Sequence, residues 1–224
     1  MALAIFDLDN TLLAGDSDYL WGRFLVEKGV VDGAHYEREN ERFYREYRAG
    51  KLDIHAFLRF SLAPLRKHSP VRLREWREEF LQTRIAPIIT QAAQALVEQH
   101  RRAGDTLLII TATNAFVTRP IAERFGVEHL IATEPETLDG HFTGGVSGEP
   151  SFREGKVNRL RLWLEANRQT LADSWFYSDS HNDLPLLEQV EHPVAVDPDA
   201  TLAEVAKSRR WPILQLHGGK SPII

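Results

Sequence analysis

The sequence predicts an α/β fold in which a parallel sheet carries helices on both faces and an all-helical block is inserted after the first strand. Short apolar segments alternate with helical stretches, a pattern typical of parallel sheets that are covered on both sides. The alternation stops between residues 15 and 84, where helix follows helix. The 224 residues, 43% of them hydrophobic, suffice for one large domain or two modest ones.

The predicted sheet consists of five apolar segments with the length and composition of buried strands. These are residues 3–6, 106–110, 129–132, 174–177 and 193–196. Helices are expected at 90–103, 116–125 and 156–167, with Gly104 and Gly126 ending the first two. Residues 136–145 read as a small hairpin that turns at Asp139 and Gly140.

The helical block is expected to form a small separate domain. Its predicted helices cover residues 19–27, 34–47, 54–65 and 72–81. We therefore divide the chain into a sheet-containing core, residues 1–14 plus 85–224, and a helical cap, residues 15–84, that lies over the strand ends.

Composition excludes several classes of protein. The formal net charge of −5 gives no reason to expect a nucleic acid or an anionic membrane as partner. The absence of cysteine removes disulfides, cysteine nucleophiles and thiolate metal sites. No signal peptide and no apolar run long enough to span a bilayer is present. We expect a cytoplasmic protein, and the sequence leaves its oligomeric state open.

Two carboxylates follow the first predicted strand. Asp7 and Asp9 stand where residues 3–6 end, and ligands of parallel α/β sheets bind beyond the carboxyl ends of the strands. If the strand continues through Asp9, both side chains share one face. If the chain bends, a backbone carbonyl can replace one carboxylate. Two such charges need a cation, and Mg²⁺ prefers hard oxygen ligands.

Three further strand ends or helix starts carry polar groups. Thr111 and Thr113 end the second strand, Lys156 opens a helix, and Asp179 and Asp183 follow the fourth strand. Taken singly, these residues read as a helix cap, an exposed lysine and an acidic turn. Taken together, they give an ordered series of acidic pair, hydroxyl, lysine and acidic pair.

This series resembles the haloacid dehalogenase superfamily of phosphatases that work through an aspartyl-phosphate. The four motifs of that superfamily match "DLDNT", the threonine of "ITAT", the lysine of "EGK" and "SDSHND", which together span residues 7–183. The helical block resembles the C1 cap of subfamily IB, the phosphoserine-phosphatase-like group. The resemblance implies a Rossmann-like core and hydrolysis of a small phosphomonoester.

The resemblance also implies residue roles. Asp7 would be the nucleophile and Asp9 the general acid and base. Mg²⁺ would be held by the Asp7 carboxylate, the Asp9 backbone carbonyl and Asp179. Thr111 and Lys156 would hold phosphate oxygens.

A further set of residues is expected around this centre. Asp183 would orient Lys156 or a metal-bound water. The candidate substrate-binding residues are Asp16, Thr113, Asn114 and Asn182.

The cap residues suggest a substrate. Phosphoserine phosphatases carry a cap acid nine residues after the nucleophile to meet the substrate amine, and Asp16 has that position. Their cap arginine, which meets the substrate carboxylate, aligns with Ser61, and Arg59 would point roughly 200° away from Ser61 on a helix. An aminated phosphate without a carboxylate is therefore expected, with histidinol phosphate as the best candidate and phosphoserine as the alternative.

Two other classes remain open at this stage. A phosphotransferase of the same superfamily also needs an acid and base at Asp9. A receiver-like signalling domain also gathers acidic residues, a threonine and a lysine around Mg²⁺, but its phosphoacceptor lies on a later strand and it needs no cap.

Overall fold

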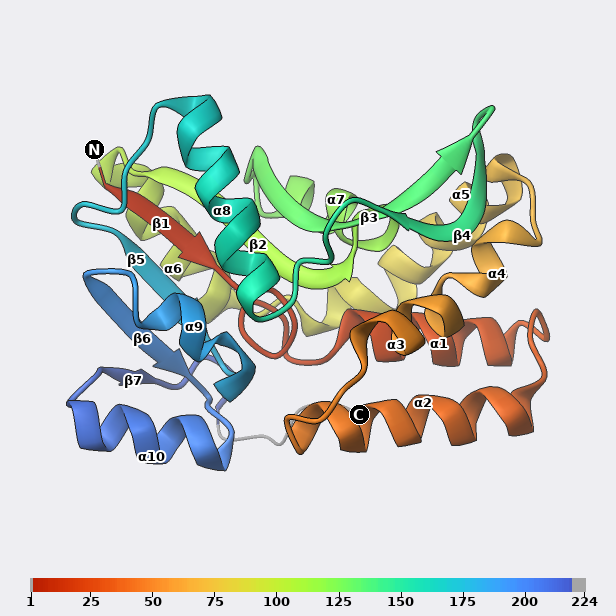
Figure 1. The fold of residues 1–224 in the computed structure, drawn as a ribbon, viewed down its shortest axis with the longest axis horizontal. Coiled ribbons are helices and arrows are strands. Elements are labelled where there is room, and N and C mark those ends of the chain that lie inside the picture. Colours follow the sequence, from red (N-terminus) through yellow and green to blue (C-terminus); the bar gives the residue numbers. More distant parts are fainter. Residues whose placement is uncertain (1, 219–224) are drawn as a thin grey trace.

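The fold is known from a computed structural model that describes residues 2–218 (Figure 1). The strands are β1 (Leu3–Phe6), β2 (Thr106–Asn114), β3 (His129–Leu138), β4 (His141–Ser147), β5 (Trp175–Ser178), β6 (His192–Val196) and β7 (Ile213–Leu214). The helices are α1 (Ser17–Glu27), α2 (Gly33–Arg48), α3 (Ile54–Ser61), α4 (Ala63–Arg66), α5 (Pro70–Phe80), α6 (Gln91–Ala103), α7 (Ala115–Arg124), α8 (Glu154–Asn167), α9 (Leu184–Leu187) and α10 (Ala200–Arg209). Short π- and 3₁₀-helical turns at Leu81–Ile85 and Ala86–Ile88 join α5 to α6.

One seven-stranded sheet has the order β4-β3-β2-β1-β5-β6-β7. All its pairs are parallel except that of β3 and β4, which confirms the predicted α/β class. Because β1 lies between β2 and β5, Ile5 pairs with Leu108 on one side and with Phe176 on the other. The carboxyl ends of β1, β2 and β5 therefore meet at one edge of the sheet.

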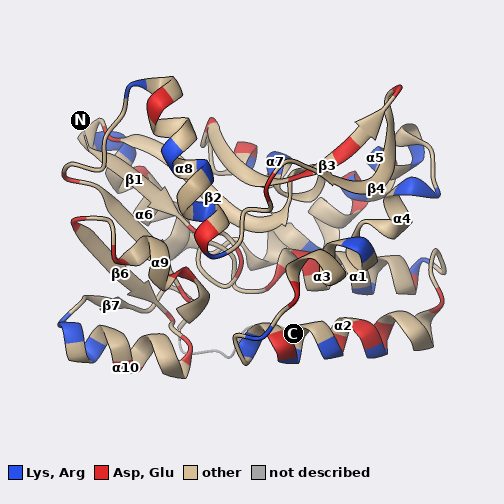
Figure 2. Ribbon diagram, viewed as in Figure 1, with Lys and Arg blue, Asp and Glu red and all other residues tan. Residues whose placement is uncertain are grey.

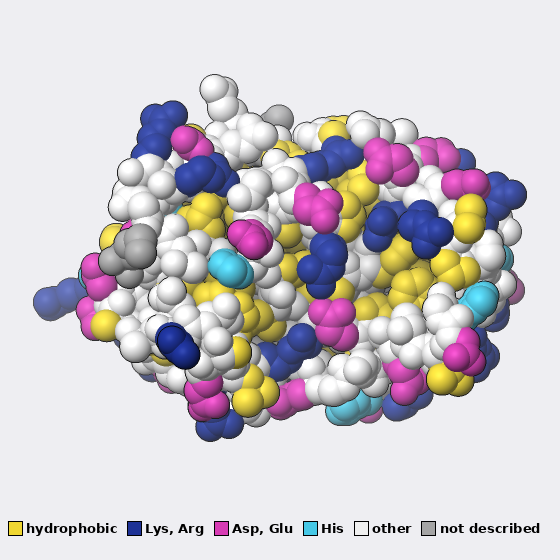
Figure 3. Space-filling view, turned by 90° about the horizontal axis from the view of Figure 1, so that it is seen from above, with side chains coloured by type: hydrophobic (Ala, Val, Ile, Leu, Met, Phe, Trp, Pro, Cys, Tyr) yellow, Lys and Arg dark blue, Asp and Glu magenta, His cyan; other side chains and the backbone are white. Residues whose placement is uncertain are grey.

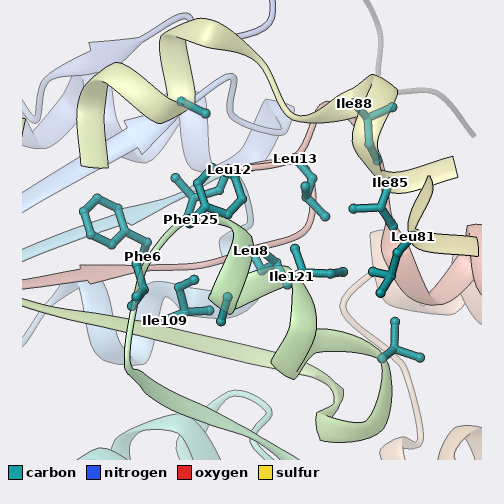
Figure 4. Close-up of a cluster of buried hydrophobic side chains, with 14 of the residues drawn as sticks. Phe6, Leu8, Leu12, Leu13, Leu81, Ile85, Ile88, Ile109, Ile121 and Phe125 are labelled. Carbon is teal, nitrogen blue, oxygen red and sulfur yellow. The ribbon is translucent and has the colours of Figure 1, made fainter. Parts of the chain in front are cut away.

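Helices cover both faces of the sheet. Leu3 and Ile5 of β1 pack in one apolar cluster together with side chains of α8, α9 and α10. Ala4 and Phe6 belong to a second cluster with side chains of α6 and α7, because successive strand residues point to opposite faces. Figure 4 shows part of this second cluster, in which Phe6 lies near residues of α7.

The helices α1 to α5 lie beyond the carboxyl ends of the central strands, at the lower and right side of Figure 1. All of them except α2 contribute side chains to the second apolar cluster, which they share with the sheet. Trp21 of α1 packs edge-on against Phe80 of α5 and against Phe116 of α7, with distances of 5.2 and 6.0 Å between the ring centroids. Figure 4 follows the same cluster from Phe6 to Leu81. The division into cap and core, with residues 219–224 outside the described part, stays a prediction.

The predicted hairpin is present as an extension of the sheet. Its turn is at Asp139 and Gly140, both with positive φ (49° and 77°), as a two-residue turn between antiparallel strands requires. The strands of the hairpin extend beyond the predicted residues 136–145, because β3 runs without interruption from the sheet into the hairpin and β4 continues to Ser147. This β3–β4 arm reaches over α3 and α4 (Figure 1).

Three other elements differ from the prediction. The helix expected at 54–65 is interrupted at Leu62, since Pro64 has no N–H to donate and lies in the first turn of the short α4. The strand β7 has two residues, too few for a periodic pattern. The helix α10 was not predicted, although Asp199 caps its first turn by accepting from Leu202 N.

Charged side chains of both signs are interspersed over the molecule. Figure 2 shows them along α2, where Arg42 pairs with Glu39 and Glu46 at 2.7 Å each. On the face seen in Figure 3 acidic and basic groups alternate with apolar ones. Within residues 2–218, no helix has both the length and the apolarity to cross a membrane.

Candidate active site

The two predicted carboxylates at the end of β1 diverge. Asp7 N donates to Tyr177 O at 2.9 Å, which prolongs the pairing of β1 with β5 by one residue. The strand has ended at Phe6, however, and the chain turns at Asp9. The two side chains therefore do not share one strand face, and of the two geometries considered above the chain adopts the bent one.

Lys156 is the cation of the site and is buried, with 3% of its surface exposed. Its Nζ lies 2.6 Å from Asp7 Oδ1 and 2.8 Å from Asp183 Oδ2. Ser178 Oγ donates to the same Asp183 oxygen at 2.7 Å. Two ion pairs raise the pKa of Lys156 although burial alone would lower it, so the lysine is charged.

A close backbone approach brings Lys156 into the site. Gly155 precedes it, and a Cβ on Gly155 would lie 2.1 Å from Pro150 O, closer than any side chain allows. Lys156 N donates to Arg153 O at 3.0 Å, where α8 begins. The glycine of the "EGK" motif thus lets the first turn of α8 pack against the preceding loop.

Asp179 follows β5 and lies beside Asp7. Thr11 Oγ1 lies 3.0 Å from Asp179 Oδ1 and 3.4 Å from Asp7 Oδ2, so one hydroxyl touches both carboxylates. Asp179 N donates back to the same hydroxyl at 3.0 Å. The role of Thr11 was missed in the sequence, although it stands inside the "DLDNT" motif.

The electrostatics of these carboxylates favour a cation. Burial, followed by the charges of Asp183 and Asp9, raises the pKa of Asp7 to about 7 even though Lys156 opposes the shift. Burial and then the charge of Asp7 raise the pKa of Asp179 well above its usual value. The hard oxygen atoms of Asp7 and Asp179 are a donor set that fits Mg²⁺, which would relieve this repulsion.

Asp9 is held on the other side of the turn. Its Oδ1 accepts from Ser17 N at 2.6 Å, and its Oδ2 accepts from Thr113 Oγ1 at 2.8 Å. Thr111 Oγ1 lies 3.5 Å from the same Oδ2. Burial, and next the charge of Asp16, raise the pKa of Asp9 to about 6, so that this carboxyl keeps a proton at higher pH than a free aspartate.

Asn182 joins the loop after β5 to the carboxyl end of α2. Arg153 donates from Nε and Nη2 to Asn182 Oδ1 at 3.0 and 2.9 Å, and also from Nη2 to Gly50 O. Asn182 Nδ2 donates to Tyr47 O at 3.2 Å. Tyr47 lies in the last turn of α2, and Gly50 follows its end by two residues. The sequence gave no signal for Arg153, because a single arginine in a loop carries no pattern.

Two acidic residues flank Ser17 at the start of α1. Asp16 caps the helix, since its Oδ1 accepts from Asp18 N at 3.0 Å and from Tyr19 N at 2.9 Å. Asp18 Oδ1 accepts from Asn114 Nδ2 at 3.3 Å. Burial raises the pKa of both carboxyls, most strongly that of Asp18.

A cavity of about 750 Å³, counted with its open mouth, brings most of the predicted residues together. The core contributes Asp7, Asp9, Asn10, Thr111, Ala112, Thr113, Phe152, Lys156, Asn182 and Asp183. The remaining wall consists of Asp16, Asp18, Tyr19, Asn40, Phe43, Tyr44, Tyr47, Leu52, Ile54 and Phe57. Of the predicted site residues, Asp179 and Asn114 are not among those that line the cavity. Asp179 is linked through Thr11 to Asp7, and Asn114 donates to Asp18.

Comparisons with known proteins agree with this geometry. Residues 4–188 match the family model described as haloacid dehalogenase-like hydrolase. A histidinol-phosphatase of Neisseria meningitidis serogroup C is 49% identical over 216 residues, which cover 95% of this chain and 97% of that protein.

Solved structures agree as well. A protein of unknown function from Bordetella pertussis Tohama I superposes with a TM-score of 0.91 at 48% identity, covering 96% of this chain and 98% of that one. A substrate-bound phosphoserine phosphatase has a TM-score of 0.71 at 20% identity, covering 95% and 92%. The latter similarity concerns the fold.

The chain belongs to the haloacid dehalogenase-like hydrolases. Within that family it is a phosphatase, as its motifs predict, and its fold is like that of the phosphoserine phosphatases. Its substrate is accordingly a small phosphate ester.

Proposed function

We propose that the protein hydrolyses histidinol phosphate. The observation that carries this proposal is the charge of the cavity wall. Five lining residues are acidic and one, Lys156, is basic, and no arginine is among the described lining residues. A substrate carboxylate would find no cationic partner there, whereas a substrate with positive groups would find several carboxylates.

The aromatic side chains of α2 and α3 support the same substrate. Phe43, Tyr44, Tyr47 and Phe57 give the cavity an apolar wall that suits a flat ring. Histidinol phosphate offers an imidazole ring and an amine but no carboxylate. The 49% identical relative is named a histidinol-phosphatase, which adds to this argument.

For the reaction we assign Asp7 as the nucleophile. Its carboxylate oxygen forms a bond to phosphorus while the bond from phosphorus to the substrate alkoxide breaks. Asp9 gives its proton to the departing alkoxide and later takes a proton from the water that attacks the aspartyl-phosphate. That attack breaks the bond between phosphorus and Asp7 and releases phosphate.

The remaining polar residues position the phosphate. Lys156 and Thr111 hold its oxygens, and Asp183 keeps Lys156 oriented. Mg²⁺, when bound by Asp7, the Asp9 backbone carbonyl and Asp179, neutralises charge on the phosphoryl group. The repulsion between Asp7 and Asp179 supports this metal assignment. A cytoplasmic location completes the proposal and agrees with a chain that lacks cysteine.

The test is a comparison of two substrates with purified protein and Mg²⁺. We expect kcat/KM for histidinol phosphate to exceed that for phosphoserine by at least about a hundredfold, because an unpaired buried carboxylate costs several kcal/mol. Equal or better hydrolysis of phosphoserine would refute the substrate. Full activity in the presence of a strong chelator would refute the metal.

A further inference from the structure

The segment that follows β7 lies against the loop of the first acidic motif. His217 Nε2 donates to the backbone carbonyl of Thr11 at 3.0 Å, although the two residues are 206 positions apart in the chain. The side chain of His217 is buried, with 5% of its surface exposed. Because a carbonyl oxygen only accepts, Nε2 carries a proton of the ring. Within the described residues, His217 is the one donor to Thr11 O.

Asp197 holds this segment in place. Its Oδ2 accepts from Leu216 N at 2.8 Å and from His217 N at 3.1 Å. Asp197 N donates to Leu214 O at 2.9 Å, directly after the pairing of Val196 with Leu214. Leu214 and Leu216 also pack against the second apolar cluster. The ring of His217 therefore extends from a backbone that is itself fixed.

Thr11 connects the contact with His217 to the carboxylates. It is fully buried, and its Oγ1 donates to Asp179 Oδ1 at 3.0 Å and accepts from Asp179 N at 3.0 Å. The same Oγ1 lies 3.4 Å from Asp7 Oδ2. A hydroxyl has a single proton, so Asp179 N sets the direction of that proton and the backbone of Thr11 sets the place of the oxygen. The hydrogen bond from His217 holds that backbone.

We propose that His217 is a positioning residue for the cation site, which holds Thr11 so that Asp7 and Asp179 keep the arrangement that binds Mg²⁺. The inference rests on the proposed metal assignment, because it concerns the residues that would hold that ion. Two carboxylates of like charge repel each other, and a partner that fixes them before the ion arrives strengthens its binding. His217 is not among the described residues that line the cavity, so we expect its effect on the affinity for Mg²⁺ and not on that for the ester.

Two substitutions of His217 form a matched pair. In His217→Gln the amide nitrogen takes the place of Nε2 and can donate to Thr11 O, whereas the shorter side chain in His217→Asn ends at the place of Nδ1. We expect the dissociation constant for Mg²⁺, measured by calorimetry without substrate, to rise about tenfold in His217→Asn and to stay within about twofold of wild type in His217→Gln. His35→Asn, the same change at an exposed position of α2, is the control.

Kinetics on 4-nitrophenyl phosphate give a second readout. The Mg²⁺ concentration for half the maximal rate should rise about tenfold in His217→Asn, while KM for the ester at saturating Mg²⁺ should change by less than about twofold. A merely structural role of His217 would lower Tm and leave the dissociation constant for Mg²⁺ unchanged.

Thr11→Val tests whether His217 acts through the Thr11 hydroxyl. Valine has nearly the shape of threonine but can neither donate to Asp179 Oδ1 nor accept from Asp179 N, so the dissociation constant for Mg²⁺ should rise at least about tenfold. Adding His217→Asn to Thr11→Val should raise it by less than about a further twofold, because both substitutions interrupt the same series of contacts.

Three results with the variants overturn the inference. These are wild-type affinity for Mg²⁺ in His217→Asn, affinity in His217→Gln as weak as in His217→Asn, and single effects that multiply in the double variant. Unchanged affinity in Thr11→Val overturns it too, whatever the stability of His217→Asn. Wild-type protein that binds no Mg²⁺ and is fully active with a strong chelator refutes the proposed metal, and this inference with it, before any variant is made. Since the ester is 4-nitrophenyl phosphate, none of these results depends on whether histidinol phosphate is the natural substrate.

Discussion

The two walls of the cavity differ in how firmly their polar groups are held. On the core wall, Lys156 contacts Asp7 and Asp183 within 2.8 Å, and the Asp9 carboxylate accepts from a backbone N–H and a hydroxyl within 2.8 Å. Within the described part of the chain, one side chain donates to Asp18 on the cap wall, that of Asn114 at 3.3 Å, and the other lining residues of this wall are mainly aromatic or aliphatic.

This difference assigns phosphoryl transfer to the core wall and the choice of substrate to the cap wall. Phosphoryl transfer depends on charges fixed before the substrate arrives, and the core wall supplies them from four strand ends or helix starts. The cap wall supplies shape, apolar surface and one adjustable carboxylate. Changes to the core wall should therefore affect every substrate, whereas changes to the cap wall should affect substrates differently.

The largest effect is expected for Asp7→Asn on the core wall. An amide cannot form the acyl-phosphate, so kcat should fall at least about a thousandfold on every substrate. Steady-state kinetics measure the rate, and circular dichroism checks that the fold is kept. Asp139→Asn, at the hairpin turn where asparagine tolerates the positive φ, is the control. Appreciable turnover by Asp7→Asn would end the proposed mechanism.

Asp9→Asn should lower kcat by different amounts for different substrates, according to how much protonation their leaving groups need. Loss of proton transfer should lower kcat roughly a hundredfold or more for alkyl phosphates. The loss should be smaller for 4-nitrophenyl phosphate, whose leaving group needs little protonation. A plot of log kcat against leaving-group pKa measures this. The same loss for good and poor leaving groups would show that Asp9 is not the acid.

Gly155→Ala tests how the core wall is built. The new Cβ would meet Pro150 O at 2.1 Å, so the first turn of α8 must shift and carry Lys156 with it. We expect a loss of about 1–3 kcal/mol in the free energy of unfolding. We also expect a fall of about tenfold in kcat/KM on all substrates.

Gly33→Ala is the matched control for that change, because its Cβ would meet only the end of the Val26 side chain. For both variants, urea titration measures the stability, and kinetics on histidinol phosphate, phosphoethanolamine and 4-nitrophenyl phosphate measure the activity. Wild-type kcat/KM in Gly155→Ala would mean that Lys156 does not depend on this backbone approach.

Arg153→Lys tests the contact between the walls. Lysine has a single donor nitrogen and cannot reproduce the contact of Nε and Nη2 with Asn182 while Nη2 also reaches Gly50 O, so docking of α2 should weaken. KM should rise about threefold for histidinol phosphate, phosphoethanolamine and 4-nitrophenyl phosphate alike, because only the molecules in which α2 is docked bind substrate. Arg161→Ala, exposed on the same α8, is the control. A rise confined to one ester would place Arg153 in substrate selection instead.

The smallest effect is expected for Asp18→Asn, in the pH dependence of its free energy of unfolding. Burial, helped by the charges of Asp16 and Asp9, raises the pKa of Asp18 in the folded protein, so ionisation of Asp18 opposes folding. The cost is absent below the unfolded pKa of about 4 and grows as pH rises toward the folded pKa. Asp18→Asn should therefore be more stable than wild type by about 1 kcal/mol at pH 8 and equal to it near pH 4.

Urea titrations at several pH values measure this difference. Asp53→Asn should show no such gain, because backbone N–H groups lower the pKa of Asp53. A gain for Asp18→Asn that does not depend on pH would contradict the electrostatic cause.

The sequence predicted the core wall better than the cap wall for a physical reason. Carboxyl ends of neighbouring parallel strands must meet, so residues at the ends of β1, β2 and β5 were expected together before any packing was known. A lone lysine at a helix start would be interpreted as exposed. Only the full series of motifs placed Lys156 in the site, where its side chain is buried.

Residues whose place depends on packing between helices were harder to predict. Asn182 was expected at the substrate, and it does line the cavity, but its amide is engaged with Arg153 and with Tyr47 O. Asp16 was expected to meet an amine, and one of its oxygens caps α1. No periodicity in a single sequence reveals which side of α2 faces the sheet.

The apolar cluster that joins Trp21 and Phe80 to Phe116 and the sheet does not include Tyr44 or Tyr47 of the cavity wall. Ile54 and Phe57 both line the cavity and pack against this cluster, whereas Tyr44 and Tyr47 line the cavity without belonging to it. Mutations at Tyr44 or Tyr47 can alter which ester is accepted without opening a void in the cluster. Lineages that diverge from this chain can therefore change their substrate at Tyr44 or Tyr47 at little cost in stability.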